Sequence, residues 1–193
     1  MKKTFILSAL VMCMSSAAYA GLDASKISVG GGVGYSIPTG NFHDTNKGSP
    51  SLAVSGEYKI AKRYALGLEM AYNYDYSIKD SQKTGSITDG KSKIWELAPF
   101  VRAMKDFTLR GKNAMAYCLV GMGVYNLKSE TDRSGDVSAD SQSKFGWNAG
   151  AGLMVEVAPQ WSVGLDLRYH NVNTDTYNTS FITPTARASY RFK

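Results

Sequence analysis

The chain is dominated by a two-residue alternation of apolar with polar or small positions, which is the period of a β-strand with two unlike faces. In the longest run, residues 64–76, Tyr, Leu and Met alternate with Gly, Ala, Asn and acidic residues. Eight such runs predict eight strands, at 27–37, 52–60, 64–76, 95–103, 114–127, 145–156, 161–170 and 182–192. The fifth run is apolar on both faces, so the sequence leaves its inward face open. No segment after residue 20 shows a helical period.

The connections between these runs alternate in length. The connections at 61–63 and 158–160 are tight, and the one at 105–113 is intermediate. Four others are long and rich in Ser, Thr, Asp, Asn and Gly: 38–50, 79–92, 128–144 and 171–180. Short turns at one end and long polar loops at the other are typical of an up-and-down barrel in an outer membrane. The sequence therefore predicts an all-β fold, an eight-stranded antiparallel up-and-down transmembrane β-barrel.

The first 20 residues have the features of a cleaved secretory signal peptide. Lys2 and Lys3 precede an apolar stretch at 5–14, and Ala18-Tyr19-Ala20 provides the small residues that a signal peptidase needs. We therefore expect a signal peptide at residues 1–20 and one barrel domain at residues 21–193. After cleavage only Cys118 remains, so no disulfide within the mature chain is possible.

Composition excludes two other classes of protein. Outside the leader no apolar run approaches the ~18 residues of a membrane-spanning helix, so a helical membrane protein is excluded. Aromatic residues make up 11% of the chain and charged residues only 20%, which does not fit a disordered chain.

Alternation alone does not say which face of the sheet points outward, because a soluble lipocalin-like carrier has the same period with its apolar face inside. Two features of the polar face favour an enclosed position. It is crowded with Gly and Ser, which fit a narrow barrel interior, and its acids nearly balance its bases, so that they can pair there. We expect an ion-pair network that closes the lumen, formed by Glu69, Glu96, Asp166, Arg168 and Arg187.

The aromatic residues of the apolar face cluster toward the strand ends, as the two interfaces of a bilayer select. One predicted belt lies near the short turns and contains Tyr64, Trp161, Tyr190 and Phe192. The other lies near the long loops and contains Tyr74, Tyr76, Trp95, Trp147 and Tyr169. We therefore expect the apolar face to contact lipid.

With these features the chain resembles the small eight-stranded outer-membrane β-barrels, such as OmpX, the transmembrane domain of OmpA and the opacity-type proteins. In the last strand, Ala186, Ala188, Tyr190 and Phe192 resemble the terminal signal of that family for the barrel-assembly machinery, although Lys193 follows the aromatic residue that usually ends the chain. The resemblance implies roles in envelope integrity, adhesion or host contact. Pro99 and Pro184 interrupt predicted strands, and we expect local bulges there.

Candidate catalytic and metal-binding groups are sparse. His43 and Asp44 lie in the first long loop, Ser77 ends the third strand, and His170 lies in the seventh; a polar loop or lumen rim accounts for them better than a lipid A-modifying enzyme does. Asp132, Asp136 and Asp140 match no known calcium loop. We predict no catalysis, no metal and no cofactor.

The formal net charge of +6 is not a nucleic-acid footprint, because many of the bases fall at the short turns, where phospholipid headgroups are expected. We interpret the chain as a monomeric integral protein of the bacterial outer membrane with a structural or surface-interaction role. Its expected partners are phospholipid, lipopolysaccharide, the barrel-assembly machinery and a surface or host ligand at the four long loops. The alternative is a small channel for ions or solutes.

Overall fold

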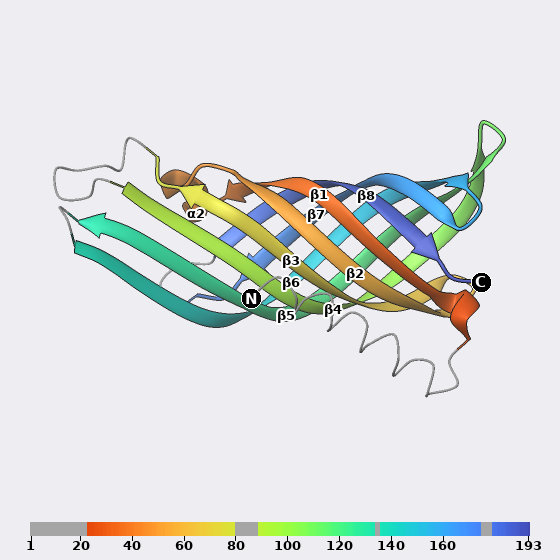
Figure 1. The fold of residues 1–193 in the computed structure, drawn as a ribbon, viewed down its shortest axis with the longest axis horizontal. Coiled ribbons are helices and arrows are strands. Elements are labelled where there is room, and N and C mark those ends of the chain that lie inside the picture. Colours follow the sequence, from red (N-terminus) through yellow and green to blue (C-terminus); the bar gives the residue numbers. More distant parts are fainter. Residues whose placement is uncertain (1–22, 80–88, 134–135, 175–178) are drawn as a thin grey trace, which may run out of the picture.

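The computed structural model describes residues 23–79, 89–133, 136–174 and 179–193. Eight antiparallel strands form one closed barrel in chain order (Figure 1). The strands are β1 (Ile27–Thr39), β2 (Ser49–Ala61), β3 (Tyr64–Ser77), β4 (Asp89–Leu109), β5 (Lys112–Arg133), β6 (Asp136–Ala158), β7 (Trp161–Val172) and β8 (Thr179–Arg191). Pairing of β1 with β8, for example Gly30 opposite Ser189, closes the ring. The predicted strand number and up-and-down topology are confirmed.

The two ends of the barrel differ. At the short-turn end, β2 passes to β3 at residues 62–63, β4 to β5 at 110–111 and β6 to β7 at 159–160, and both β1 and β8 have their terminal ends there. At the other, long-loop end, a five-residue helix, α2 (Asn41–Thr45), connects β1 to β2. A single 3-10 turn, η1 (Ala24–Lys26), precedes β1. Within the described part of the chain, neither helix is long and apolar enough to cross a membrane.

Three consecutive strands are longer than the sequence predicts. β4, β5 and β6 have 21, 22 and 23 residues, whereas the other strands have 12 to 14. Of the segments predicted as loops, residues 89–92, 128–133 and 136–144 are strand, and β5 pairs with β6 as far as Arg133 opposite Asp136. The predicted connection at 105–113 is a tight hairpin. Arg110 and Gly111 both have positive φ there, as a type I′ turn requires.

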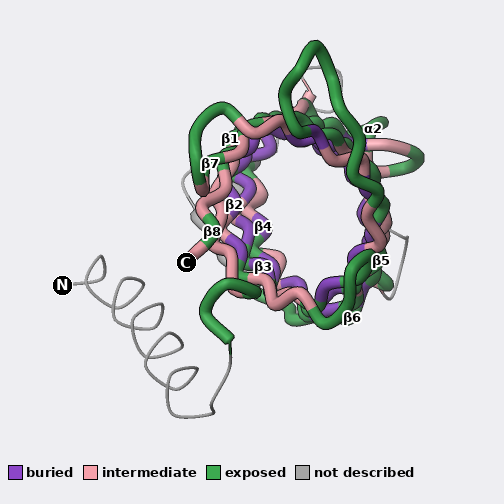
Figure 2. Tube along the Cα trace, turned by 90° about the vertical axis from the view of Figure 1, so that its right-hand side faces the viewer, coloured by how far each residue is buried: buried purple, intermediate pink, exposed green. Residues whose placement is uncertain are grey.

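Side chains alternate between the outside of the barrel and its lumen. On β7, Leu165 and Leu167 are exposed on the outside, whereas Asp166 and Arg168 are buried. Figure 2 shows the ring end-on, with buried positions recurring along the strands. The fifth strand follows the same rule: Tyr117 and Leu119 are buried and Val120 is exposed, so the odd-numbered residues of β5 face the lumen. An apolar exterior around a polar interior reverses the pattern of a soluble protein.

Within the described strands the pairing register shifts at three places, and none of them is at Pro99 or Pro184. The pairing register shifts between Lys59 and Ala61, between Asn73 and Tyr76, and between Glu156 and Ala158. Pro99 stays in register opposite Leu68, and Pro184 opposite Leu167, so the expectation of bulges at the prolines is wrong.

The register shift in β3 also changes the position of one residue that was predicted in the outer belt. Tyr76 is fully buried, whereas Tyr74 is exposed on the outside. The irregular stretch between Asn73 and Tyr76 reverses the parity of the strand. Tyr76 therefore points into the lumen, and its placement in the outer belt is wrong.

Candidate functional site in the barrel lumen

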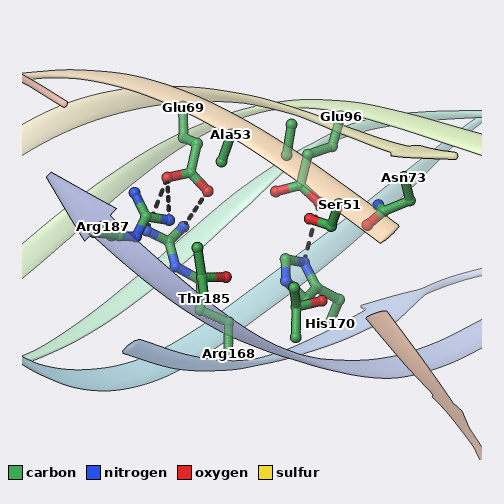
Figure 3. A pocket seen from close by; sticks show the side chains of 11 residues that line it. Ser51, Ala53, Glu69, Asn73, Glu96, Arg168, His170, Thr185 and Arg187 are labelled. Carbon is green, nitrogen blue, oxygen red and sulfur yellow. Dashed lines mark hydrogen bonds and ion pairs between the residues drawn. The ribbon is translucent and has the colours of Figure 1, made fainter. Parts of the chain in front are cut away.

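The middle of the lumen holds four charged side chains from three strands. Arg168 on β7 donates two hydrogen bonds to the Glu69 carboxylate on β3, at 2.6 and 2.9 Å. Arg187 on β8 lies 2.7 Å from Glu69 and 2.7 Å from Asp166, which also accepts from Arg168 at 3.2 Å. Figure 3 shows the Glu69 carboxylate joined by dashed lines to the guanidinium groups of Arg168 and Arg187. We call these four residues the charged cluster.

The charged cluster is electrically neutral, and this explains how it can be buried. Its two carboxylates and two guanidinium groups have side chains at most 6% exposed. A buried charge without a partner costs several kcal/mol, whereas mutually hydrogen-bonded charges offset that cost. Each acid here meets both bases, so removal of any one member leaves an excess charge inside the barrel.

Glu96 lies beside this cluster and has a different partner. Its carboxylate on β4 is 3.0 Å from Nδ1 of His170 on β7. The His170 ring stacks on Phe181 with centroids 4.5 Å apart, and the Tyr125 hydroxyl is 3.3 Å from Nδ1. The structure thus brings four of the five predicted network residues into one cluster. The fifth, Glu96, pairs with His170 instead. Sequence reasoning treated His170 only as a rim group, although its parity with Asp166 and Arg168 placed it on the same face.

Toward the long-loop end the lumen becomes apolar. The side chains of this part, which we call the outer apolar cluster, are at most 1% exposed: Tyr76, Ile94, Tyr125, Val172 and Phe181. Phe42 of α2 packs on Tyr76 with ring centroids 5.1 Å apart. The alternation of the sequence did not indicate this cluster, because Tyr125 lies in the run that is apolar on both faces and Tyr76 follows a register shift.

Toward the short-turn end the lumen is closed by a mixed group. Arg102 pairs with Glu57 at 2.8 Å, and its guanidinium lies over the Tyr117 ring at 4.1 Å. The Phe100 ring fills the space beside Gly67, where a Cβ atom would overlap the ring. The small residue at 67 therefore makes room for the large one at 100.

Little space remains beside the charged cluster. The cavity lined by Glu69, Glu96, Arg168 and His170 has a volume of about 10 Å³, room for one water molecule at most. A second cavity, of about 70 Å³, lies at the short-turn end beside Glu57 and Arg102. The lumen is filled by side chains, as expected for eight strands.

The candidate catalytic groups do not form a site. His43 on α2 is exposed; its ring lies 3.9 Å from Asp44 and 3.4 Å from the Lys79 ammonium, and no hydrogen bond in the described part of the chain joins it to Ser77. No group of three His, Cys, Asp or Glu residues suited to a metal occurs among the described side chains. Asp132, Asp136 and Asp140 lie outside the side chains that the structure describes.

On the exterior, aromatic residues flank the apolar zone. Tyr64 and Trp161 near the short-turn end, and Tyr74, Trp95 and Trp147 near the long-loop end, are exposed on the outside. Trp161 packs on Tyr190, which contacts Phe192, and Trp147 packs on Tyr169. Apart from Tyr76, the predicted belt residues thus lie on the outward face.

A closed antiparallel barrel with a filled, charged lumen and an apolar exterior defines a membrane-spanning β-barrel protein. Residues 6–192 match the family described as outer membrane protein beta-barrel domain, and the chain belongs to that family. It is an integral protein of the bacterial outer membrane. No curated protein sequence matches the chain.

Solved structures with the same fold are distant in sequence. Neisserial surface protein A shares 15% identity with a TM-score of 0.58, and the match covers 87% of this chain and 98% of that one. Ail, the attachment invasion locus protein of Yersinia pestis, shares 19% identity with a TM-score of 0.56, over 86% and 97% of the two chains. The N-terminal β-barrel domain of Pseudomonas aeruginosa OprF shares 13% identity with a TM-score of 0.51, over 87% and 98%. At these identities the likeness shows the fold alone.

Proposed function

We propose that the protein is a non-catalytic outer-membrane barrel that acts through its long-loop end, where it contacts surface or host ligands. The observation that carries this proposal is the projection of β4, β5 and β6. β4 continues six residues beyond Trp95 to Asp89, and β6 begins nine residues before Phe145. At ~3.3 Å per residue this is about 20–30 Å of paired strand beyond the aromatic residues, a surface that a purely structural barrel does not need.

The filled lumen supports this function over transport. The charged cluster and the outer apolar cluster both occupy the path that a solute would take. We expect no discrete current steps when the protein is inserted in planar bilayers. Steady steps at neutral pH would favour the channel instead. Catalysis at His170 is disfavoured, because the cavity beside its ring is too small for a substrate to enter.

A related fold offers a precedent for a surface ligand. One structure of Ail from Yersinia pestis, with a TM-score of 0.53, is a complex with the heparin analogue sucrose octasulfate. For the present chain we propose a ligand-binding role for the projecting sheet without assigning that ligand.

The orientation is tested by epitope tags on intact cells. A tag inserted between Arg133 and Asp136 is expected to bind antibody from outside, because the long-loop end would face the medium. A matched tag at Gly111, in the β4–β5 turn of the other end, is expected to bind only after the cells are opened. The reverse result would overturn the proposal.

The signal peptide, the monomeric state and the remaining partners are also proposals. Residues 1–20 lie outside the described residues, and we propose that they are a signal peptide removed after Ala20; N-terminal sequencing of the membrane form should then begin at Gly21. We further propose that the mature protein is a monomer in contact with phospholipid and lipopolysaccharide. Its last strand would engage the barrel-assembly machinery, although Lys193 follows Phe192.

A further inference from the structure

The methionines of the barrel gather at one place in the lumen. After residue 20 the chain has five, and two of them, Met70 and Met122, are exposed on the outside of the barrel. The other three line the cavity of about 70 Å³ at the short-turn end: Met104, Met115 and Met154. They come from β4, β5 and β6, which are neighbouring strands. We call these three residues the methionine triad.

The strand register places the three thioether side chains close together. Met115 lies directly opposite Met154 in the β5–β6 pairing. Met104 lies opposite Tyr117, two positions from Met115 on the same face, so it is the diagonal neighbour of Met115. Opposed and diagonal residues on one face of a sheet lie within reach of long side chains. Met104 and Met115 both pack against the buried group that contains Met154, so the three flexible side chains can converge on one point.

The space around the triad indicates a role beyond filling the lumen. Methionine adapts to irregular gaps, so three methionines that only filled the barrel would leave little room beside them. The cavity that they line nevertheless has about 70 Å³, against about 10 Å³ beside the charged cluster. Met104 and Met115 are half-buried. At Gly164 on β7 an added Cβ atom would lie 2.7 Å from the Met154 sulfur, so the glycine leaves room for that sulfur.

The charges around the cavity favour a ligand set without charge. Arg102 is already paired with Glu57 at 2.8 Å. Asp106, which lies opposite Met115, is the other acid of the lining. Ca²⁺ and Mg²⁺ require several oxygen ligands, chiefly carboxylates, and this lining offers few. A singly charged, soft ion bound by neutral sulfur is better suited to a lining that also contains three bases: Lys26, Lys59 and Arg191.

We propose that the methionine triad binds Cu(I), with the three thioether sulfurs as its ligands. Thioether sulfur is a soft ligand that selects Cu(I), whereas carboxylate oxygens suit magnesium, calcium and manganese. The buried side of the triad is lined by Phe100, Tyr117 and Leu119, which keep water from that side. The expectation of no metal concerned carboxylate and histidine groups, which prefer other cations. This site lies at the end opposite the projecting strands, so it is independent of the proposed function.

The test is a titration of the full-length protein with Cu(I) in neutral detergent micelles, without oxygen, in competition with the chromophoric chelator bicinchoninate. Both cysteines are first replaced, as Cys13→Ser and Cys118→Ser, because a thiolate would bind the same ion. This background protein is expected to bind one Cu(I) per chain. The triple variant Met104→Leu, Met115→Leu, Met154→Leu should bind at least about tenfold more weakly, because leucine keeps the volume but lacks the sulfur.

The matched control replaces the two outward methionines, as Met70→Leu and Met122→Leu, in the same background. It should bind Cu(I) as tightly as the background protein, and X-ray absorption should show sulfur atoms around its copper. Equal binding by the triple variant and the control would overturn the proposal, as would copper surrounded by nitrogen or oxygen alone. Uptake that disappears with His43→Ala would also overturn it, because the exposed ring would then be the ligand.

Stability separates loss of the ligands from loss of the fold. A folded triple variant should keep the heat-dependent gel mobility of the background protein. Because an ion that binds only the folded state stabilises it, Cu(I) should raise the urea midpoint of the background and control proteins but not that of the triple variant. If the triple variant does not fold, Met115→Leu alone removes the middle ligand and should still weaken binding. Urea midpoints that Cu(I) leaves unchanged in every protein would contradict the site.

Discussion

Two neighbouring regions of the same lumen are closed by opposite means. The charged cluster fills the middle of the barrel with Glu69, Asp166, Arg168 and Arg187, whereas the outer apolar cluster fills the long-loop end with rings and aliphatic side chains. His170 joins them, because it pairs with Glu96 and stacks on Phe181. The two regions should respond differently to substitution. Each apolar side chain contributes its own buried area, whereas each charge is tolerable only while its partners remain.

The largest effect is expected from Arg168→Ala. This change leaves Glu69 and Asp166 facing Arg187 alone, with one uncompensated negative charge in a buried site. Breaking a buried pair costs about 3–5 kcal/mol. The measurement is the free energy of unfolding in urea, with the barrel in phospholipid vesicles. Arg191→Ala, at an exposed position of the short-turn end, is the control and should change the free energy by less than about 0.5 kcal/mol. Equal effects of the two variants would contradict the charged cluster's role in stability.

A somewhat smaller effect is expected from Phe181→Ala in the outer apolar cluster. Phe181 is fully buried and contacts both Tyr76 and His170, so its loss leaves a cavity. The free energy of unfolding should fall by about 3 kcal/mol. Phe181→Leu, which keeps most of the volume, should cost less than half as much in the same urea experiment. If both variants lower the free energy of unfolding equally, this cluster does not stabilise the barrel through packing.

Replacing all four charges together should cost less than removing one. In the variant Glu69→Gln, Asp166→Asn, Arg168→Met, Arg187→Met, no buried charge of the cluster remains unpaired. Neutral replacements of similar volume for buried ion pairs are often tolerated. We expect a loss of about 2 kcal/mol or less, against the larger loss for Arg168→Ala. A fourfold variant less stable than Arg168→Ala would show that the ion pairs contribute net stability.

The smallest effect is expected at the junction of the two regions, from His170→Gln. Glutamine can still donate a hydrogen bond to Glu96, but it lacks the ring that stacks on Phe181. The expected loss is about 1 kcal/mol. His170→Ala, which removes the donor as well, should cost more. A difference between the two variants in urea midpoint measures the contribution of the Glu96 contact; identical midpoints would mean that this contact adds nothing.

Several features of the molecule follow directly from the order of its residues. The alternation of Leu165 and Leu167 with Asp166 and Arg168 places two unlike faces on one strand, and eight such runs predict the strand number. The aromatic residues toward the strand ends and the glycine-rich polar face indicate which face lies outside. These are local properties, because a strand has a period of two residues regardless of what it pairs with.

Other features arise only when the ring closes. Glu69 and Arg168 are 99 residues apart in sequence, and only the stagger of the strands decides that these two meet while Glu96 meets His170. The register shift after Asn73 turns Tyr76 inward. The sequence could not show which residues of β5 face the lumen, because both faces of that strand are apolar. The polar segments at 89–92 and 128–133 are strand because each finds a neighbour with which to pair. Pairing partners, bulges and contacts across a lumen join distant parts of the chain, so no local pattern contains them.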